Sequence, residues 1–209
     1  MMRVFPKDLK GRPLEGAKVI VGAISIHLAP GAKTGTLSNE TTKGYVAFPL
    51  LPTGNYSYRI LWKGVEVCFG TKYLGYHPTY RARPSQFEVT CRVGDLRIRA
   101  LDGMNDTIEA EFSVLGRTPV SGDSILVFLR MKEYVKNGTF VIRQVPPSVY
   151  TVEATNRSAA FGKEVRSSAV LELGPEIGPE NEIAVRLPVF GARIVVISED
   201  GDLLDAYLL

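Results

Sequence analysis

The chain has few of the residues from which most active sites are built. Its 209 residues include two histidines, two cysteines and one tryptophan. His27 and His77 stand far apart with no second ligand near either, and neither is placed to activate a cysteine. The sequence offers no nucleophile–base pair and no cluster of metal ligands, so we expect neither an enzyme nor a bound cofactor or metal.

Long runs of one kind of residue are also missing. The 25 Lys and Arg and the 22 Asp and Glu are spread along the whole length, so no basic block marks a nucleic-acid partner. No apolar run in this segment is long enough to span a membrane, and no signal-peptide core follows Met1. A secreted protein needs such a signal, so we expect these residues to be a mature or excised segment of a longer precursor.

Asparagine is scarce outside one motif. Of the six asparagines, only Asn181 does not begin an Asn-x-Ser/Thr triplet. Such triplets accept N-linked glycans on the outer side of a membrane. The turn preference of Asn, Ser and Thr enriches the triplet but does not explain the near absence of Asn elsewhere. We therefore predict an extracellular or cell-surface glycoprotein, glycosylated at turns or strand ends on Asn39, Asn55, Asn105, Asn137 and Asn156.

The chain repeats itself. Residues 3–60 and 97–154 align in constant register, and the Gly, Pro and Tyr anchors of 44–58 match those of 138–152. A third copy begins at residues 192–197, with Asp200-Gly201 as its turn. We predict one domain over residues 1–93, a second over 94–189, and the start of a third repeat or a donor strand over 190–209.

Each repeat has the pattern of β-structure. Short alternating or apolar segments are separated by Gly- and Pro-rich turns at the spacing typical of a β-sandwich, and no segment has a helical period. The segments expected to form strands are 3–5, 17–21, 45–48, 56–60 and 87–90 in the first repeat, and 125–129, 140–142 and 150–154 in the second. The fold class is therefore predicted to be all-β, with tandem antiparallel sandwiches and an extra C-terminal strand segment.

The first repeat carries a fuller motif, Asp-x-x-Gly-x-Pro-Leu-x-Gly-Ala, which is followed by Gly-x-x-x-Phe and by Leu-Pro-x-Gly-x-Tyr-x-x-x-Ile. Its residues are Asp8, Gly11, Pro13, Leu14, Gly16, Ala17, Gly44, Phe48, Leu51, Pro52, Gly54, Tyr56 and Ile60. This motif resembles the prealbumin-like sandwich family, which includes carboxypeptidase regulatory-like domains and Cna protein B-type repeats. The resemblance implies an Ig-like or prealbumin-like fold that serves as a stalk, spacer or assembly module. The second repeat departs from the motif, with Ser148 in place of Gly54.

Cys68 and Cys91 fall within the later strands of the first repeat. In an oxidising compartment two cysteines in one small domain usually pair, and a loop of this length would add about 3 kcal/mol of stability. We predict a disulfide; the alternative is a pair of buried free thiols.

Two further groups of residues permit a second interpretation. Asp102, Asp106, Glu109 and Glu111 suggest a calcium loop, but their spacing does not fit an EF-hand, and Asp-Gly is common turn chemistry, as at Asp200-Gly201-Asp202. Exposed aromatic residues form sugar-binding faces in many proteins. Here they include Trp62, Tyr73, Tyr76 and Tyr80, with Arg81 and Arg83 nearby.

These features favour a structural protein that forms a rod-like part of a surface stalk, S-layer or filament. The joints at 92–95 and 187–191 are not flexible Gly/Ser tethers, and such a glycoprotein would suit an archaeal source. Its expected partners are itself, as a homopolymer, or further repeats of the chain. The apolar assembly strand would be Ile194, Val195, Val196, Ile197, Leu203 and Leu204, which can join a neighbour's sheet. The alternative is a carbohydrate- or protein-binding accessory module of a secreted enzyme.

Overall fold

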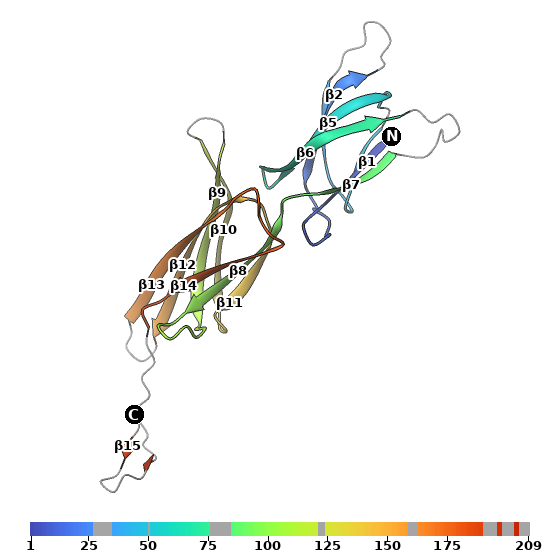
Figure 1. Cartoon of the computed structure of the whole chain (residues 1–209). Coiled ribbons are helices and arrows are strands. Elements are labelled where there is room, and N and C mark those ends of the chain that lie inside the picture. The colour runs from blue at the N-terminus through green and yellow to red at the C-terminus, as the bar shows by residue number, and fades with distance from the viewer. Residues whose placement is uncertain are drawn as a thin grey trace.

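The computed structural model describes residues 1–26, 35–49, 51–75, 85–120, 124–158, 163–189, 196–197 and 203–204. All elements in this part of the chain are strands, arranged as two sandwiches that follow one another along the chain (Figure 1). The predicted all-β class and the tandem sandwiches are confirmed. The domain boundaries at 93/94 and 189/190 remain predictions.

The first sandwich packs a four-stranded sheet against a three-stranded one. The large sheet has the order β3-β2-β5-β6, and the small sheet β4-β1-β7. The strands are β1 (Met2–Lys7), β2 (Lys18–Ile26), β3 (Thr36–Glu40), β4 (Val46–Phe48), β5 (Gly54–Trp62), β6 (Val65–Leu74) and β7 (Ser85–Thr90).

The second sandwich repeats this plan strand for strand. Its large sheet has the order β10-β9-β12-β13 and its small sheet β11-β8-β14. The strands are β8 (Gly94–Leu101), β9 (Ala110–Pro119), β10 (Ile125–Val135), β11 (Thr139–Val145), β12 (Ser148–Ser158), β13 (Lys163–Leu173) and β14 (Glu180–Arg186). β15 (Val196–Ile197) and β16 (Leu203–Leu204) form a two-stranded sheet with each other.

Alternating burial explains why these segments form sandwiches. In β2, Val19 and Val21 are buried while Ile20 between them is half-buried, and β12 buries Tyr150 and Val152 in the same way. Each sandwich therefore encloses its own apolar core. Among the described residues, the first core extends from Met2 to Val93 and the second from Leu96 to Leu187.

One feature of the sheets differs from the prediction of antiparallel sandwiches. The first and last strands of each domain, β1 with β7 and β8 with β14, pair in parallel. Parallel neighbours require a long crossover, which the intervening five strands of each domain supply. Because the two strands run the same way, the chain enters each domain at one end and leaves it at the other.

Two tyrosines hold equivalent turns. The Tyr56 hydroxyl donates to the Pro52 carbonyl at 2.8 Å, and the Tyr150 hydroxyl donates to the Pro146 carbonyl at 2.7 Å. The contact is the same in both domains, although Ser148 stands in the second where Gly54 stands in the first. Burial raises the pKa of both hydroxyls, so they stay protonated donors.

Replacing Tyr150 by Phe should lower the free energy of unfolding of the second domain by about 1–2 kcal/mol, because the buried Pro146 carbonyl loses its donor. Tyr56→Phe is the matched change in the first domain. Urea unfolding of both variants measures the effect. An unchanged midpoint for Tyr150→Phe would contradict this account of the turn.

Candidate functional site: the joint between the two domains

The joint begins with a loop that occurs in both domains. In the first, Asp8 Oδ1 accepts the backbone N–H groups of Lys10 and Arg12 at 2.9 and 2.8 Å. The turn needs a φ of 77° at position 11, a backbone conformation that residues with a side chain rarely adopt, and Gly11 supplies it. Asp8 is fully buried, so its carboxylate is a fixed centre for the loop.

The second copy of the loop has the same backbone plan. Asp102 Oδ1 accepts the N–H groups of Met104 and Asp106 at 2.8 and 2.9 Å, and Asn105 takes the left-handed position at φ 70°. Asp102 therefore acts as a turn residue. The other acidic residues of the calcium-loop interpretation have partners of their own. The Glu109 carboxylate accepts a hydrogen bond from the Tyr134 hydroxyl, and Glu111 forms an ion pair with Lys132. Among the described residues no group of three His, Cys, Asp or Glu is placed to hold a metal ion.

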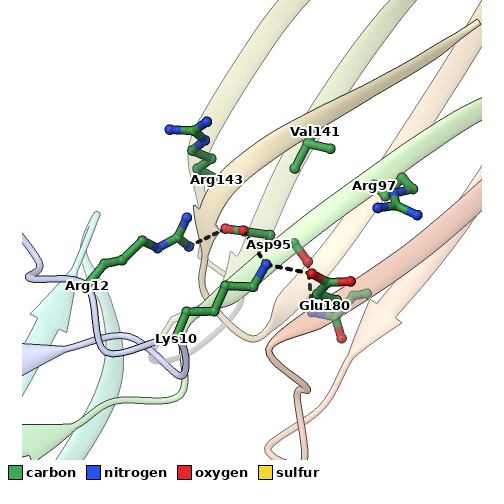
Figure 2. Close-up of a pocket in the computed structure, with 8 residues that line it drawn as sticks. Lys10, Arg12, Asp95, Arg97, Val141, Arg143 and Glu180 are labelled. Atoms are coloured by element: carbon green, nitrogen blue, oxygen red, sulfur yellow. Dashed lines mark hydrogen bonds and ion pairs between the residues drawn. The ribbon is translucent and has the colours of Figure 1, made fainter.

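The first loop reaches across to the second domain through Asp95. Arg12 donates from Nε to Asp8 at 2.7 Å and from Nη2 to Asp95 at 2.5 Å, so one guanidinium bridges two acids from different domains. Lys10 Nζ lies 3.0 Å from Asp95 and 2.8 Å from Glu180. Figure 2 shows both cations pointing from the loop toward these carboxylates.

Gln144 closes this network from the second domain. Its backbone N–H donates to Asp95 at 3.1 Å, and its side-chain amide donates to Asp8 at 3.2 Å and to the Pro13 carbonyl at 3.0 Å. Its φ of 54° is unusual for a residue other than glycine. The indole N–H of Trp62 donates to the Gln144 carbonyl at 2.7 Å, so the only tryptophan of the chain lies at the joint.

Apolar contacts accompany these polar ones. Leu9 belongs to the first domain but packs against the core of the second. Gly64, in the turn between β5 and β6, lies so close to Leu126 of β10 that an added Cβ would stand 2.8 Å from its Cδ2 atom. The two domains therefore also meet through apolar contacts.

The segment that connects the two domains, residues 93–96, is packed against both of them. The carbonyl of Val93 accepts the N–H of Leu9, and Val93 is buried in the first core while Leu96 is buried in the second. Gly94 lies against the Gly178 carbonyl, where a Cβ would not fit. The connection between the domains is therefore short and packed, and it leads directly into β8.

The charged network fixes the ionisation of both acids. Burial by itself raises the pKa of Asp95, but hydrogen bonds from Arg12, Lys10 and the Gln144 N–H outweigh it and lower the pKa to about 2. The pKa of Asp8 is lowered in the same way, against burial, by Arg12, Gln144 and Lys10. Both carboxylates are therefore charged across the physiological range.

Other residues singled out in the sequence lie elsewhere. Cys68 and Cys91 are free thiols, so the predicted disulfide is not formed in this structure. Cys68 lies within β6, and the Cys91 thiol donates to the Val89 carbonyl at 3.8 Å. The nearby Cys91 side chain lowers the pKa of the Cys68 thiol. Trp62 is buried at the joint, which removes it from the proposed aromatic face, whereas Tyr73 is exposed. Tyr76, Tyr80, Arg81, Arg83, His27, His77, Ile194 and Val195 lie outside the described residues.

Four of the five predicted glycosylation sites are exposed. Asn105 and Asn137 lie in turns, Asn55 at the start of β5, and Asn39 within β3 rather than in a loop. Asn156 contradicts the prediction. It lies inside β12, is only 9% exposed, and its amide nitrogen donates to the Glu109 carbonyl at 2.7 Å. A glycan needs that nitrogen and open space, and Asn156 provides neither.

The comparisons with known proteins bear on the fold only. No protein-family model and no curated protein matches the chain. Solved structures similar to it include a mutant of the major pilin from Streptococcus pyogenes, at TM-score 0.43 and 9% identity over 90% of this chain and 97% of that one. A mutant of the shaft pilin spaA from Lactobacillus rhamnosus GG gives TM-score 0.38 and 9% identity over 92% and 100%. A Streptococcal ancillary pilin gives 0.36 and 16% over 89% and 61%.

Structural similarity of this extent supports no argument about function. The functional proposal below rests on the strand order and on the joint between the domains. No helix in the part of the chain that the structure describes is long and apolar enough to cross a membrane.

Replacing Asp95 by Ala should loosen the joint and cost about 2 kcal/mol, because Arg12 and Lys10 lose a shared, largely buried partner. Trp62 fluorescence during urea unfolding reports on the joint directly. Glu182→Ala removes a half-exposed acid that pairs with Arg99 on β8 and is the control. Equal effects of the two substitutions would count against a special role for Asp95.

Acid should open the joint. Because the pKa of Asp95 is lower in the folded protein than the ordinary 3.8, its stabilisation is complete above about pH 4 and is lost as the pH falls toward 2. The lowered pKa of Asp8 acts in the same direction. Trp62 fluorescence should therefore change between pH 4 and 2, and Asp95→Asn should remove most of that step. A step that persists in Asp95→Asn would refute this assignment.

Proposed function

We propose that the chain is a structural, N-glycosylated protein of the cell surface, a rod-like segment of a stalk, S-layer or filament. The single observation that carries this proposal is the packed joint, in which Arg12 bridges Asp8 of one domain and Asp95 of the next. A protein whose domains only need to be near each other would not require a network of ion pairs around two buried acids at their connection.

The path of the chain supports the same function. Each domain receives the chain at the start of its first strand and releases it at the end of a parallel last strand. Tension applied at the two ends would pull these neighbouring strands along their length, so all the hydrogen bonds between them would share the load. This arrangement suits a protein that transmits force along its axis.

The exposed Asn-x-Ser/Thr triplets (sequons) support the extracellular part of the proposal. Asn39 and Asn55 lie on the large sheet of the first domain, and Asn105 and Asn137 lie in turns of the second. Glycans at these positions would project into water without entering either core. Self-contacts would then use the surfaces that these four sites leave bare.

Assembly by strand addition is the finer part of the proposal. Among the described residues, Val196 and Ile197 pair with Leu203 and Leu204 and with no third strand. A hairpin of two strands is marginally stable by itself in water. We infer that the apolar segment Ile194–Ile197 completes its pairing with a strand of another sheet.

Electron microscopy of the native, glycosylated protein tests this function, with filaments or a lattice expected. Deleting residues 192–209 should abolish assembly and leave both domains folded, since the described residues of both cores lie before residue 190. Intact-mass analysis should find glycan on sequons other than Asn156. The proposed assembly would be refuted if the native material were monomeric or if polymers still formed after the deletion.

A further inference from the structure

The outward face of the large sheet in the first domain carries exposed aromatic side chains. Tyr73 and Phe69 lie on β6, the edge strand of that sheet, and are 57% and 65% exposed. Lys72 is half-buried and Leu74 is buried, so Tyr73 between them points away from the core. An aromatic ring of this exposure offers a large apolar area to a ligand.

The register of the sheet places a sequon beside Tyr73. Asn55 of β5 lies directly opposite Tyr73. Asn55 is exposed and the next residue, Tyr56, is buried, so Asn55 also points outward. Side chains directly opposite each other on antiparallel strands have Cβ atoms about 5 Å apart on one face of the sheet. The amide nitrogen that would carry a glycan therefore lies next to the Tyr73 side chain.

The described residues around Asn55 on this face carry no charge. They include Ile24 and Ser25 of β2, Ser57 of β5 and Thr71 of β6. The next charged residue of the outward row in β5 is Arg59, which lies opposite Phe69 and pairs with Glu66 at 2.5 Å. The two exposed aromatic residues thus differ in what they face, because Tyr73 faces an asparagine and Phe69 faces an ion pair.

The Tyr73 side chain also lies against the backbone that follows it. A Cβ atom added to Gly75 would stand 3.4 Å from Tyr73 Cε1, so the ring edge lies close to the main chain at that residue. Tyrosine has only two side-chain torsions, and a ring placed in this way loses little conformational freedom when a ligand packs on it.

A sugar is a suitable ligand for such a ring. One face of a pyranose presents C–H groups and is apolar, while the hydroxyl groups point outward around the ring. The apolar face packs on an aromatic ring and leaves the hydroxyls in water, as the amphipathic tyrosine does with its own hydroxyl. The first sugar of a glycan on Asn55 would be held beside Tyr73 by a covalent bond, so the entropic cost of this contact is low.

The other exposed sequons differ in this respect within the part of the chain that the structure describes. Asn39 lies opposite Val19, which is buried. Asn105 and Asn137 lie in turns, and the Asn105 side-chain oxygen accepts a hydrogen bond from Arg186. The register therefore pairs Asn55, but not Asn39, with an exposed aromatic ring.

We propose that Tyr73 is a binding platform for the chain's own glycan: the first sugar on Asn55 packs on the Tyr73 ring. The inference rests on the proposed function, because it requires N-glycosylation. The sugar would cover the exposed ring on the β6 edge of the sheet and so restrict the pairing of that edge with another chain.

Urea unfolding of the native, glycosylated full chain tests the contact through a double-mutant cycle of Asn55→Gln and Tyr73→Ser. With Tyr73 present, removing the glycan by Asn55→Gln should raise the unfolding equilibrium constant roughly threefold, because the contact with the ring is lost. In the Tyr73→Ser background Asn55→Gln should have no effect. Phe69→Ser, on the same strand and face, is the matched control and should preserve the effect of the glycan.

The same cycle in unglycosylated protein separates the sugar from the asparagine itself. There the two substitutions should be additive, since the Tyr73 ring has no sugar to contact. Coupling of the same size without glycan would overturn the inference, because the asparagine side chain would then account for it.

Proton NMR of the glycoprotein supplies a second measurement. The ring current of Tyr73 should shift the protons of the first sugar on Asn55 upfield, and Tyr73→Ser should abolish that shift while Phe69→Ser keeps it. Unshifted sugar protons together with an additive cycle would overturn the inference and leave the proposed function standing. A glycan that glycopeptide mass spectrometry finds on Asn39, Asn105 or Asn137 but not on Asn55 would have the same meaning. Absence of glycan from all sequons would overturn the glycosylation in the proposed function as well.

Discussion

Asp95 is the residue on which the geometry of the two-domain unit depends. Its carboxylate is nearly buried at the start of β8, and such a charge is tolerated only when donors surround it. Two of those donors, Arg12 and Lys10, come from the other domain. The second domain therefore satisfies its own buried charge only when the first is docked in one orientation. A flat apolar contact would have allowed sliding, whereas this network fixes a register.

The second domain copies the architecture of the first without copying the joint. Strand order, the tyrosine turn and the aspartate loop all recur. At the loop positions that carry Lys10 and Arg12, however, the second copy has Met104 and Asp106. The same backbone thus presents two cations in one domain and none in the other. Duplication preserved the fold, and the side chains on its loops diverged.

The surfaces of the two domains divide in a similar way. In the first, both edges of the large sheet stand beside sequons, at Asn39 and Asn55. In the second, each edge strand of the large sheet mixes exposed charged and apolar residues, as Arg166 and Val170 do on β13 and Lys132 and Val127 on β10.

The sequence by itself determined the local and repetitive features of the molecule. Alternation at residues 17–21 and the turns around Pro52 and Pro146 followed from short segments, because neighbouring residues fix strands and turns. The parallel pairing of first and last strands did not, since it depends on contacts across a whole domain.

The candidate site was decided only by the tertiary structure. Asp8 was visible as a motif residue, and the connection at 92–95 as a stiff one, but nothing in the sequence linked them to Gln144, far along the chain. The sequence also did not predict that Asn156 and Trp62 are buried, because neither a glycosylation triplet nor an aromatic residue indicates which strands will pack over it. Local pattern specified what each segment would become, and packing decided which segments would meet.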